Sequence, residues 1–367
     1  MKTEVLPVDP LAPAAEPIRR AAEVLQRGGT VAFPTETVYG LGANAWDAAA
    51  VRRIFAAKGR PPDNPLIVHV AQRRGMEEVV RAVPPEAEEL MRSFWPGPLT
   101  LVLPRHPAVP DVVTGGLETV GVRMPAHPVA LALIEAAGVP VAAPSANRSG
   151  RPSPTEAGHV LEDLDGRIDL LLDAGPTGVG VESTVLDLTC RPPVLLRPGG
   201  VTLEELRSVL GEVAVGGSEG AAERPRSPGM KYTHYAPRAP MVVVEGAVSS
   251  SALARAVWAL AEEEAGAGRR VGILATAETA PFYQQMASSW PPAGAPPPLV
   301  LVVGERSRPA SVAAGLFATL RRFDASGVDF IVAEGVPEEG IGLAIMNRLR
   351  KAAGYRIRRI SPPGGPG

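Results

Sequence analysis

Apolar runs and helical periods alternate along the first 210 residues of the chain. Apolar runs bounded by turn residues predict strands at residues 30–33, 65–70, 99–104, 120–125, 140–145, 168–175, 183–188 and 193–198. Stretches with helical periodicity and glycine at their ends predict helices at residues 16–29, 46–59, 127–138 and 202–211. Because several connecting loops are short, we expect one α/β domain over residues 1–210, with a mixed rather than a purely parallel sheet.

Residues 211–240 interrupt this pattern and are predicted to be a linker, because they are rich in Gly, Pro and Ser and lack a helical period. Beyond the linker, strands at 240–246, 269–276, 298–304 and 328–336 alternate with helices at 251–266, 311–327 and 343–354. This order predicts a small doubly wound parallel sheet over residues 241–367. That domain has neither a G-x-G-x-x-G after a strand nor a Walker sequence, so a dinucleotide or P-loop role is not supported.

The composition is that of a soluble globular protein and excludes several kinds of site. With 367 residues, 45% of them hydrophobic, the chain is long enough for two domains with cores of their own. It lacks an apolar run of the ~20 residues that a membrane helix needs, and its first ten residues lack a signal peptide's apolar region, so we expect a cytoplasmic protein. The single cysteine, Cys190, excludes an internal disulfide framework and a cysteine-cluster metal site.

The net charge of −2 provides no global basic field that would attract nucleic acid nonspecifically, although it leaves a local basic pocket open. The five histidines include no i,i+4 pair, so any metal is expected to arrive with a substrate. Only four of the basic residues are lysines. In such a chain, a lysine in a polar loop suggests a need for a compact point charge, which draws attention to Lys58 and Lys231.

Three polar segments follow predicted strands or helices and could carry chemistry. The first, FPTETVYGLG at residues 33–42, places three hydroxyl groups and a carboxylate where a strand should end. Open α/β sheets usually bind their ligands at such ends, so a binding loop is one interpretation and an ordinary surface turn is the other.

The second segment, AKGRPPDNPLIVHV at residues 57–70, has Lys58 and Arg60 at the end of a predicted helix. These cations could cap the helix, or they could form an anion clamp suited to a triphosphate. For His69, inside the next strand, the pattern favours a hydrogen-bonded buried histidine over a ligand contact.

The third segment, APSANRSGRPSPT at residues 143–155, combines four hydroxyls, an amide and two arginines. It could be a turn-rich surface loop or a phosphate or ribose site. Thr119 and Arg123 lie on one face of a strand, and a buried Arg123 would be costly unless it pairs with a carboxylate or a ligand anion. Glu182, Ser183 and Arg197 at other strand ends could be structural or functional.

Groups that are absent are also informative. We find no nucleophile elbow, no defensible Ser-His-Asp order and no cysteine nucleophile. The recurring groups are hydroxyl, guanidinium and amide at strand ends. This set favours the positioning and electrostatic stabilisation of a phosphoryl group over covalent catalysis.

In this order, PTETVYGLG, KGRPPDNPLIVH, PSAN and GVEST resemble the YrdC-like family, and HYAP with the second domain resembles its longer, two-domain L-threonylcarbamoyladenylate synthases. The resemblance implies a twisted-sheet domain with a deep basic cavity, followed by a smaller Rossmann-like domain. It implies a nucleotidyltransferase that converts L-threonine, bicarbonate or CO2, and ATP to threonylcarbamoyl-AMP and pyrophosphate. Downstream threonylcarbamoyl transferase proteins would then form threonylcarbamoyladenosine beside the anticodon of tRNA.

The family's motifs match this chain without departure, and the resemblance assigns its site residues. Lys58 and Arg60 are the implied catalytic residues and also contact ATP. The other implied ATP contacts are Asn64, Thr119, Ser145, Asn147, Ser153, Arg197, His234 and Tyr235. The implied threonine pocket contains Thr35, Thr37, His69, Arg123, Ala143 and Ser183. Mg²⁺ would be held mainly by the phosphate oxygens of the nucleotide, without a metal site in the protein.

Two other functions are alternatives for a chain with these motifs. A non-enzymatic RNA-binding module is the main alternative, although an aromatic content of 4% counts against it. A carbamoyl-transfer maturation enzyme would need paired-cysteine zinc sites, which one cysteine cannot form.

The segment 227–237, with Lys231, Tyr232, His234 and Tyr235, is expected to dock either at the domain interface alone or at the cavity mouth as a lid.

Overall fold

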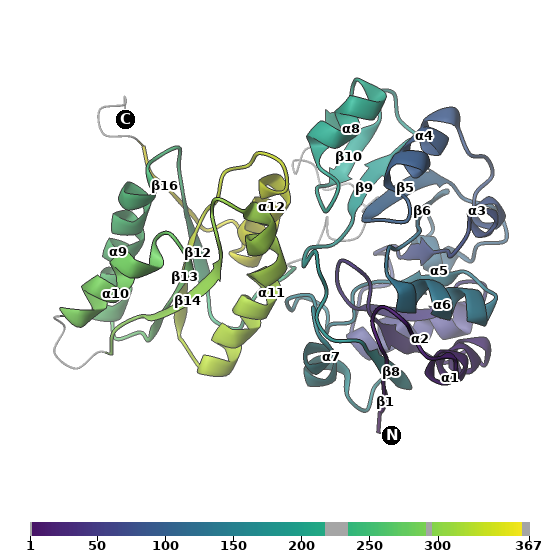
Figure 1. The fold of residues 1–367 in the computed structure, drawn as a ribbon, viewed down its shortest axis with the longest axis horizontal. Helices are drawn as coiled ribbons and strands as arrows, with labels where there is room; N and C mark the ends of the chain where they lie inside the picture. The colour runs from purple at the N-terminus through teal and green to yellow at the C-terminus, as the bar shows by residue number, and fades with distance from the viewer. Residues whose placement is uncertain (1, 217–233, 291–295, 362–367) are drawn as a thin grey trace. The chain divides into compact units, whose positions relative to one another are not determined.

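The computed structural model describes residues 2–216, 234–290 and 296–361. The chain forms two compact units, each with its own sheet (Figure 1). The first unit contains the described residues up to Ser149 and those from Ser153 to residue 216. The second unit contains the tripeptide Gly150–Pro152 together with the described residues from His234 onward.

The first unit is built on an eleven-stranded sheet in the order β1-β8-β2-β3-β7-β4-β6-β5-β9-β10-β11. Its strands are β1 (Glu4–Pro7), β2 (Val31–Phe33), β3 (Gly40–Asn44), β4 (Ile67–His69), β5 (Leu99–Pro104), β6 (Thr119–Arg123), β7 (Val141–Ala143), β8 (Leu170–Asp173), β9 (Thr184–Asp187), β10 (Val194–Arg197) and β11 (Ala214–Val215). The sheet combines parallel pairs such as β4 with β6 and antiparallel pairs such as β4 with β7. The predicted mixed sheet is confirmed.

The helices of this unit are α1 (Ala15–Gln26), α2 (Ala48–Lys58), α3 (Arg73–Val79), α4 (Pro85–Phe94), α5 (Asp111–Thr114), α6 (Pro128–Ala137), α7 (Ala157–Leu164) and α8 (Leu203–Leu210). Helix α2 shows how local sequence sets their limits. The carboxylate of Asp47 accepts hydrogen bonds from the amides of Ala49 and Ala50 at its start. Gly59 ends it in the left-handed conformation, with φ 61°. The last helical residue is therefore Lys58, which belongs to the candidate site.

Helices α1 and α6 pack against β2, β7 and β8 through a buried apolar cluster that includes Leu25, Phe33, Leu133 and Leu172. This packing fixes the strands whose ends carry the polar segments 33–42 and 143–155. The polar residues thus lie on a rigid scaffold.

Two short strands of the first unit lie in segments that the hydrophobic pattern assigns to loop and linker. Strand β3, GLGAN, starts inside the polar segment 33–42 and pairs antiparallel with β2 and β7. Strand β11 lies within residues 211–240 and adds to the sheet beside β10. Both are defined by pairing with neighbours, and neither has the apolar alternation that predicts a strand.

The second unit has a five-stranded sheet in the order β14-β13-β15-β12-β16, in which every pairing is parallel. Its elements are β12 (Met241–Glu245), α9 (Ser250–Gly266), β13 (Val271–Thr276), α10 (Ala280–Ser288), β14 (Leu299–Gly304), α11 (Pro309–Ser326), β15 (Phe330–Glu334), α12 (Gly342–Ala352) and β16 (Ile357–Arg359). Helices α9 and α10 cover one face of the sheet and α11 and α12 the other (Figure 1). The predicted doubly wound parallel sheet is confirmed.

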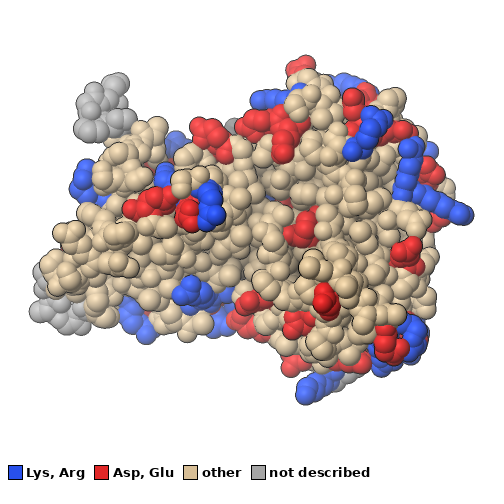
Figure 2. All heavy atoms as spheres, in the orientation of Figure 1, with Lys and Arg blue, Asp and Glu red and all other residues tan. Residues whose placement is uncertain are grey.

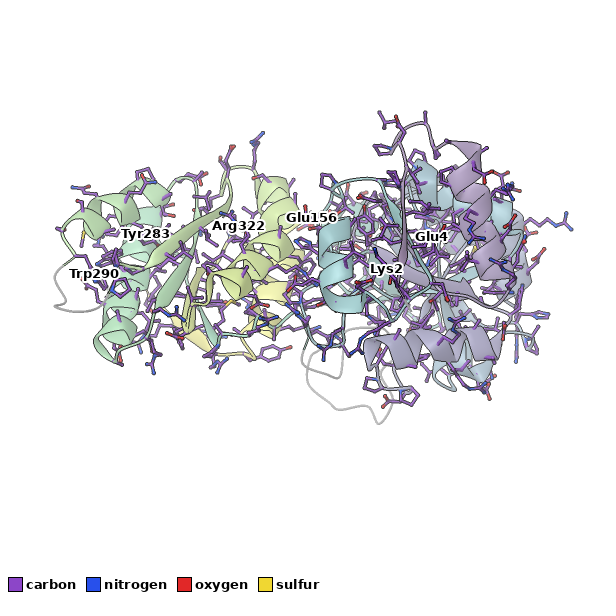
Figure 3. The ribbon with its side chains drawn as sticks, turned by 90° about the horizontal axis from the view of Figure 1, so that it is seen from below. Lys2, Glu4, Glu156, Tyr283, Trp290 and Arg322 are labelled. Atoms are coloured by element: carbon purple, nitrogen blue, oxygen red, sulfur yellow. The ribbon has the colours of Figure 1, made fainter. Side chains whose placement is uncertain are left out.

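An aromatic cluster fills the core under α9 and α10. The ring of Trp258 stacks on Tyr283 at 6.2 Å between centroids and meets Trp290 edge-on at 5.2 Å; Tyr283 and Trp290 are labelled in Figure 3. The Tyr283 hydroxyl donates to the buried carboxylate of Glu334 at 2.5 Å. Burial, with the negative charge of Glu334, raises the pKa of Tyr283 well above its usual range, so this hydroxyl stays protonated.

In the part of the chain that the structure describes, no helix combines the length and the apolar character that crossing a membrane requires.

Candidate functional site

The loop between β2 and β3 is a compact hydroxyl-lined turn. The Thr35 hydroxyl donates to the carbonyl of Val38 at 2.7 Å and accepts from the amide of Thr37 at 3.2 Å. The hydroxyls of Thr35 and Thr37 lie 2.8 Å apart, and both residues are buried. Buried hydroxyls fixed in this way form a rigid polar wall, which favours the binding-loop interpretation of segment 33–42.

This loop holds two other polar segments in place through its backbone. The carbonyl of Tyr39 accepts from the amide of Ala146 at 2.8 Å, and the amide of Tyr39 donates to the carbonyl of Pro154 at 2.9 Å. The carbonyl of Glu36 accepts from the amide of Val179 at 2.8 Å. The segments 143–155 and 179–184, far apart in sequence, are thereby joined to the β2–β3 loop.

Arg123 lies at the end of β6, opposite His69 in the parallel register of β4 and β6. Its guanidinium donates to the Thr37 hydroxyl at 3.1 Å and to the carbonyl of Gly97 at 3.2 Å. Its Nη2 also lies 2.6 Å from Oε2 of Glu36, an ion pair without the alignment of a hydrogen bond. A carboxylate therefore partners this buried arginine within the protein, and the Arg123 side chain is 5% exposed.

His69 is buried beside this ion pair, as the strand pattern suggests. Burial, and after it the positive charge of Arg123, lowers the pKa of His69 from 6.5 to about 3. Its ring meets Phe33 edge-on at 6.2 Å, and Nδ1 lacks a hydrogen bond of ordinary geometry among the described residues. A neutral imidazole with an unsatisfied nitrogen can bind a small polar ligand without adding charge.

A second cluster forms where β9 begins and β10 ends. Arg197 donates to the carbonyl of Ser183 at 2.9 Å and to its hydroxyl at 3.1 Å. The Ser183 hydroxyl also lies 2.8 Å from that of Thr100. A Cβ on Gly199 would lie 2.3 Å from the carbonyl carbon of Ser183, so only glycine permits this close backbone approach. Arg197 and Ser183, assigned by resemblance to different substrates, are thus direct neighbours.

A third cluster joins the end of α2 to segment 143–155. The Lys58 ammonium is buried and donates to the carbonyl of Ser145 at 2.6 Å and to that of Asn147. The Ser145 hydroxyl donates to the side-chain oxygen of Asn147 at 2.5 Å. Lys58 therefore reaches from its helix to the loop that carries the Ser-x-Asn signature.

Arg60 and Asn64 belong to the same turn after α2. The Arg60 guanidinium donates to the carbonyls of Asn64 at 3.3 Å and Pro65 at 2.9 Å. The side-chain oxygen of Asn64 is buried and makes no hydrogen bond among the described residues. A buried amide oxygen without a partner is costly in a finished core, and a bound ligand would satisfy it.

The remaining predicted residues of the first unit are less closely connected. The Ser153 hydroxyl donates to the carboxylate of Glu182 at 2.5 Å, directly before Ser183. Ala143 ends β7 and is buried. Thr119 starts β6, at the opposite end of the strand from Arg123, and its backbone partner is Pro104. In the described part of the chain, no side-chain hydrogen bond joins Thr119 to another predicted site residue.

His234 and Tyr235 belong to the second unit. The Tyr235 ring stacks on Phe317 at 5.2 Å, and the guanidinium of Arg348 lies 5.6 Å from the Tyr235 ring centroid. Tyr235 takes a left-handed conformation with φ 66°. Most of segment 227–237, including Lys231, lies outside the described residues.

Sequence reasoning noted the carboxylate of Glu36 and named Glu182, but it gave neither a partner, and it did not single out Thr100. Glu36 stands inside the segment 33–42, and the cost of burying Arg123 was the signal for it. Thr100 lies in an apolar strand, where nothing in the sequence distinguishes it.

The predicted site residues of the first unit include four buried cations: Lys58, Arg60, Arg123 and Arg197. Glu36 and Glu182 are two acidic side chains that contact predicted site residues. Within the described residues, no group of three or more His, Cys, Asp or Glu side chains could hold a metal ion. Buried guanidinium, ammonium, hydroxyl and amide groups together can bind anions and stabilise developing negative charge.

Comparisons with known proteins agree with this picture. The model of the Sua5/YciO/YrdC family, described as telomere recombination, matches residues 23–199, and the model of the threonylcarbamoyl-AMP synthase C-terminal domain matches residues 201–354. The threonylcarbamoyl-AMP synthase of Bacillus subtilis is 52% identical over 344 residues, which cover 93% of this chain and 94% of that protein. That of Pyrococcus abyssi is 51% identical over 347 residues, covering 94% and 96%.

The fold is also similar to that of a solved structure. The crystal structure of P. abyssi Sua5 complexed with L-threonine superposes with a TM-score of 0.89 at 49% identity, covering 98% of this chain and all of that one. Two family models together span most of the chain, and relatives about half identical match it nearly from end to end. The chain therefore belongs to the Sua5/YciO/YrdC family, among its two-domain threonylcarbamoyl-AMP synthases.

Proposed function

We propose that the protein is an L-threonylcarbamoyladenylate synthase, a nucleotidyltransferase that forms threonylcarbamoyl-AMP and pyrophosphate from L-threonine, inorganic carbon and ATP. The names of its relatives and the L-threonine bound to P. abyssi Sua5 support this proposal. The observation that carries it is that the β2–β3 loop contacts two groups of predicted site residues. Its Thr37 accepts from the buried Arg123, and its backbone bonds the segment 143–155, which Lys58 also holds.

The threonine pocket is proposed to consist of Thr35, Thr37, His69, Arg123, Ala143 and Ser183. Arg123 would bind the substrate carboxylate, because its fork-shaped guanidinium matches two carboxylate oxygens. His69 stays neutral at pH 7 and would bind a polar group of the amino acid through its unsatisfied nitrogen. The fixed hydroxyls of Thr35 and Thr37 would line the pocket beside Arg123.

ATP is proposed to bind to Lys58, Arg60, Asn64, Thr119, Ser145, Asn147, Ser153 and Arg197, and to His234 and Tyr235 of the second unit. The cations among them would neutralise the phosphates, and the amides and hydroxyls would bind the ribose or base. ATP would enter as its magnesium complex, with Mg²⁺ held mainly by phosphate oxygens as part of the substrate. A deep basic cavity in the domain of residues 1–210 is part of this proposal.

The reaction follows from charge. The deprotonated amine of threonine attacks CO2, a C–N bond forms, and a proton leaves the nitrogen to give a carbamate. A carbamate oxygen then attacks the α-phosphorus of ATP while the bond to the bridging oxygen breaks and pyrophosphate leaves. Lys58 and Arg60, with Arg197, would stabilise the charge that builds up on the phosphoryl group.

The product would be consumed by threonylcarbamoyl transferase proteins acting on tRNA in the cytoplasm. The alternative, a non-enzymatic RNA-binding module, would need a broad basic surface. On the face seen in Figure 2, acidic and basic side chains are interspersed, which favours a small-molecule substrate over a nucleic acid backbone.

A mass spectrum of the product formed from threonine, bicarbonate and ATP tests the proposal. We expect threonylcarbamoyl-AMP, together with pyrophosphate release that requires threonine. If no adduct forms while the protein retains tRNA in a filter-binding assay, the RNA-binding alternative replaces the enzyme.

A further inference from the structure

The tripeptide Gly150–Pro152 belongs to the second unit, although both of its flanks belong to the first. The carbonyl of Gly150 accepts from the amide of Ala236 at 2.9 Å. The carbonyl of Pro152 accepts from Nη2 of Arg321, on α11, at 2.6 Å. Both ends of the tripeptide are therefore bound through their backbone to residues of the second unit.

Arg151, the central residue, is held by its side chain. Its Nη2 lies 3.0 Å from Oδ2 of Asp324, one turn after Arg321 on α11, and the Asp324 side chain is 2% exposed. The other oxygen of Asp324 accepts from the amide of Arg238 at 2.7 Å. The buried carboxylate of Asp324 thus binds both the Arg151 side chain of the tripeptide and the backbone amide of Arg238.

Arg321 is 4% exposed, and a buried guanidinium requires a compensating role. At Leu316 and Leu320, which are fully buried, the same helix packs with apolar side chains. A charged donor directed at a loop carbonyl instead fixes the path of that loop.

The flanks of the tripeptide are fixed in the first unit. Before it, the carbonyl of Asn147 accepts from the ammonium of Lys58, and the amide of Ser149 donates to the carbonyl of Lys58 at 2.9 Å. After it, the Ser153 hydroxyl donates to Glu182 at 2.5 Å. Asn147 precedes Gly150 by three residues and Ser153 follows Pro152 directly, so a shift of the tripeptide moves both.

We propose that Arg321 and Asp324 are positioning residues for ATP: through the tripeptide Gly150–Pro152 they fix the loop that carries Asn147 and Ser153. This gives the second unit a part in the reaction through the position of that loop. The inference rests on the proposed function, because the assignment of ATP to Asn147 and Ser153 does.

The test uses the full chain with Arg321→Gln, Arg321→Lys and Asp324→Asn. The matched control is Arg322→Gln, since Arg322 is the exposed next residue of α11 and is labelled in Figure 3. We expect Arg321→Gln and Asp324→Asn to raise the KM for ATP by about tenfold, as loss of a hydrogen bond to a charged group does, with the KM for threonine unchanged. Arg321→Lys keeps a cationic donor and should recover part of the loss.

Amide hydrogen exchange gives a second readout that does not depend on ATP. In Arg321→Gln the amide of Ala236, bonded to Gly150, should exchange faster than in the Arg322→Gln control. Faster exchange with an unchanged KM for ATP would overturn the positioning role. So would an equal rise in both KM values with a lower melting temperature. If Asn147→Ala does not weaken ATP binding, the assignment of Asn147 to the ATP site fails, and the inference fails with it.

Discussion

Arg123 has the internal partner that its sequence position requires, and it also contacts the proposed threonine pocket. Its ion pair with Glu36 provides the internal partner that a buried charge requires, and its guanidinium also donates to Thr37 in the proposed threonine pocket. An arginine already held by a carboxylate and a carbonyl is preorganised, so little side-chain entropy remains to be lost when a ligand binds.

We expect Arg123→Ala to weaken threonine binding far more than ATP binding. A bidentate guanidinium–carboxylate contact in a poorly solvated site is worth ~2–4 kcal/mol. Calorimetric titration of each substrate measures this, with Glu36→Gln as the comparison, because that variant keeps the guanidinium and removes its internal partner. Equal losses for both substrates in Arg123→Ala would leave the ion pair as a structural feature only.

Lys58→Ala should abolish adenylate formation while the protein stays folded. Because the carbonyls of Ser145 and Asn147 lose a charged donor, the free energy of unfolding should also fall by ~1–3 kcal/mol. Pyrophosphate release and thermal unfolding are the measurements, and Arg52→Ala, an exposed position on the same helix, is the control. Retained turnover with a large drop in melting temperature would instead support a purely structural role.

We expect His69 to make the stability of the protein depend on pH. Its pKa of about 3 in the folded state lies below the ordinary 6.5, so the unfolded chain takes up a proton between these values and the folded protein does not. The free energy of unfolding therefore falls as the pH falls below about 7, by about 2 kcal/mol at pH 5. The difference between the melting temperatures at pH 7 and pH 5 should be smaller in His69→Gln than in the unchanged protein. The exposed His106→Gln should keep the full dependence, and equal behaviour of the two variants would contradict the account.

These residues also show how far sequence reasoning reaches. The cost of burying Arg123 identified the residue that needs a partner, because charge in an apolar strand is a strong physical signal. His69 gave no such signal: a neutral buried histidine is compatible with any core, and only the family resemblance assigned it to a site. Glu36 was noted only as one polar group of its segment, since a carboxylate in a loop is ordinary and does not reveal which residue it will pair with.

At the scale of elements, the strand β10 and the turn after it bring Arg197 against Ser183. The fit depends on Gly199, where a Cβ would meet the backbone of Ser183 and Thr184 at 2.3 Å. No side chain can move to relieve this contact, because the neighbouring atoms are backbone.

Gly199→Ala is therefore expected to separate β10 from the start of β9 and to lower both stability and turnover. Overpacking typically costs ~1–3 kcal/mol, and a backbone contact of this kind should lie at the upper end. Gly178→Ala, at an exposed glycine whose added Cβ would meet nothing within 4 Å, is the control. Thermal unfolding and pyrophosphate release would be compared, and identical behaviour of the two variants would refute the argument.

The hydrophobic pattern predicted long apolar strands well and short paired strands poorly. Strand β5 occupies the residues 99–104 that the pattern gives, because six consecutive apolar or β-branched residues leave few alternatives. Strand β3, with two glycines in five residues, forms only because β2 and β7 lie on either side of it. Such strands depend on tertiary pairing, which a local pattern does not contain.

For the whole molecule, the parallel sheet of the second unit could be predicted from the strict alternation of strands and helices. The membership of Gly150–Pro152 in that unit could not, since a turn-rich tripeptide between two site segments has no feature that assigns it to a distant domain. Its assignment depends on hydrogen bonds to residues more than 80 positions away.

A fragment ending at residue 216 is expected to fold and to turn over poorly. It keeps β11, which pairs with β10 beside Arg197, but it loses the residues that bind Gly150–Pro152 and it loses His234. Thermal unfolding and pyrophosphate release should be measured beside a fragment ending at residue 210. That shorter fragment lacks β11 and should be less stable. Full turnover by the longer fragment would show that the second unit is dispensable.

The order of strands in the first sheet has a consequence for how the protein is made. Among the described residues, strand β1 pairs only with β8, Glu4 opposite Leu170, and β5 pairs with β9, Leu99 opposite Thr184. At ~5–20 residues per second, a ribosome needs on the order of 10–30 s to bring the partner of β1 out after β1 itself. During that interval the first strand has no edge to join, so the nascent domain depends on late-arriving partners and on whatever shields its apolar strands meanwhile.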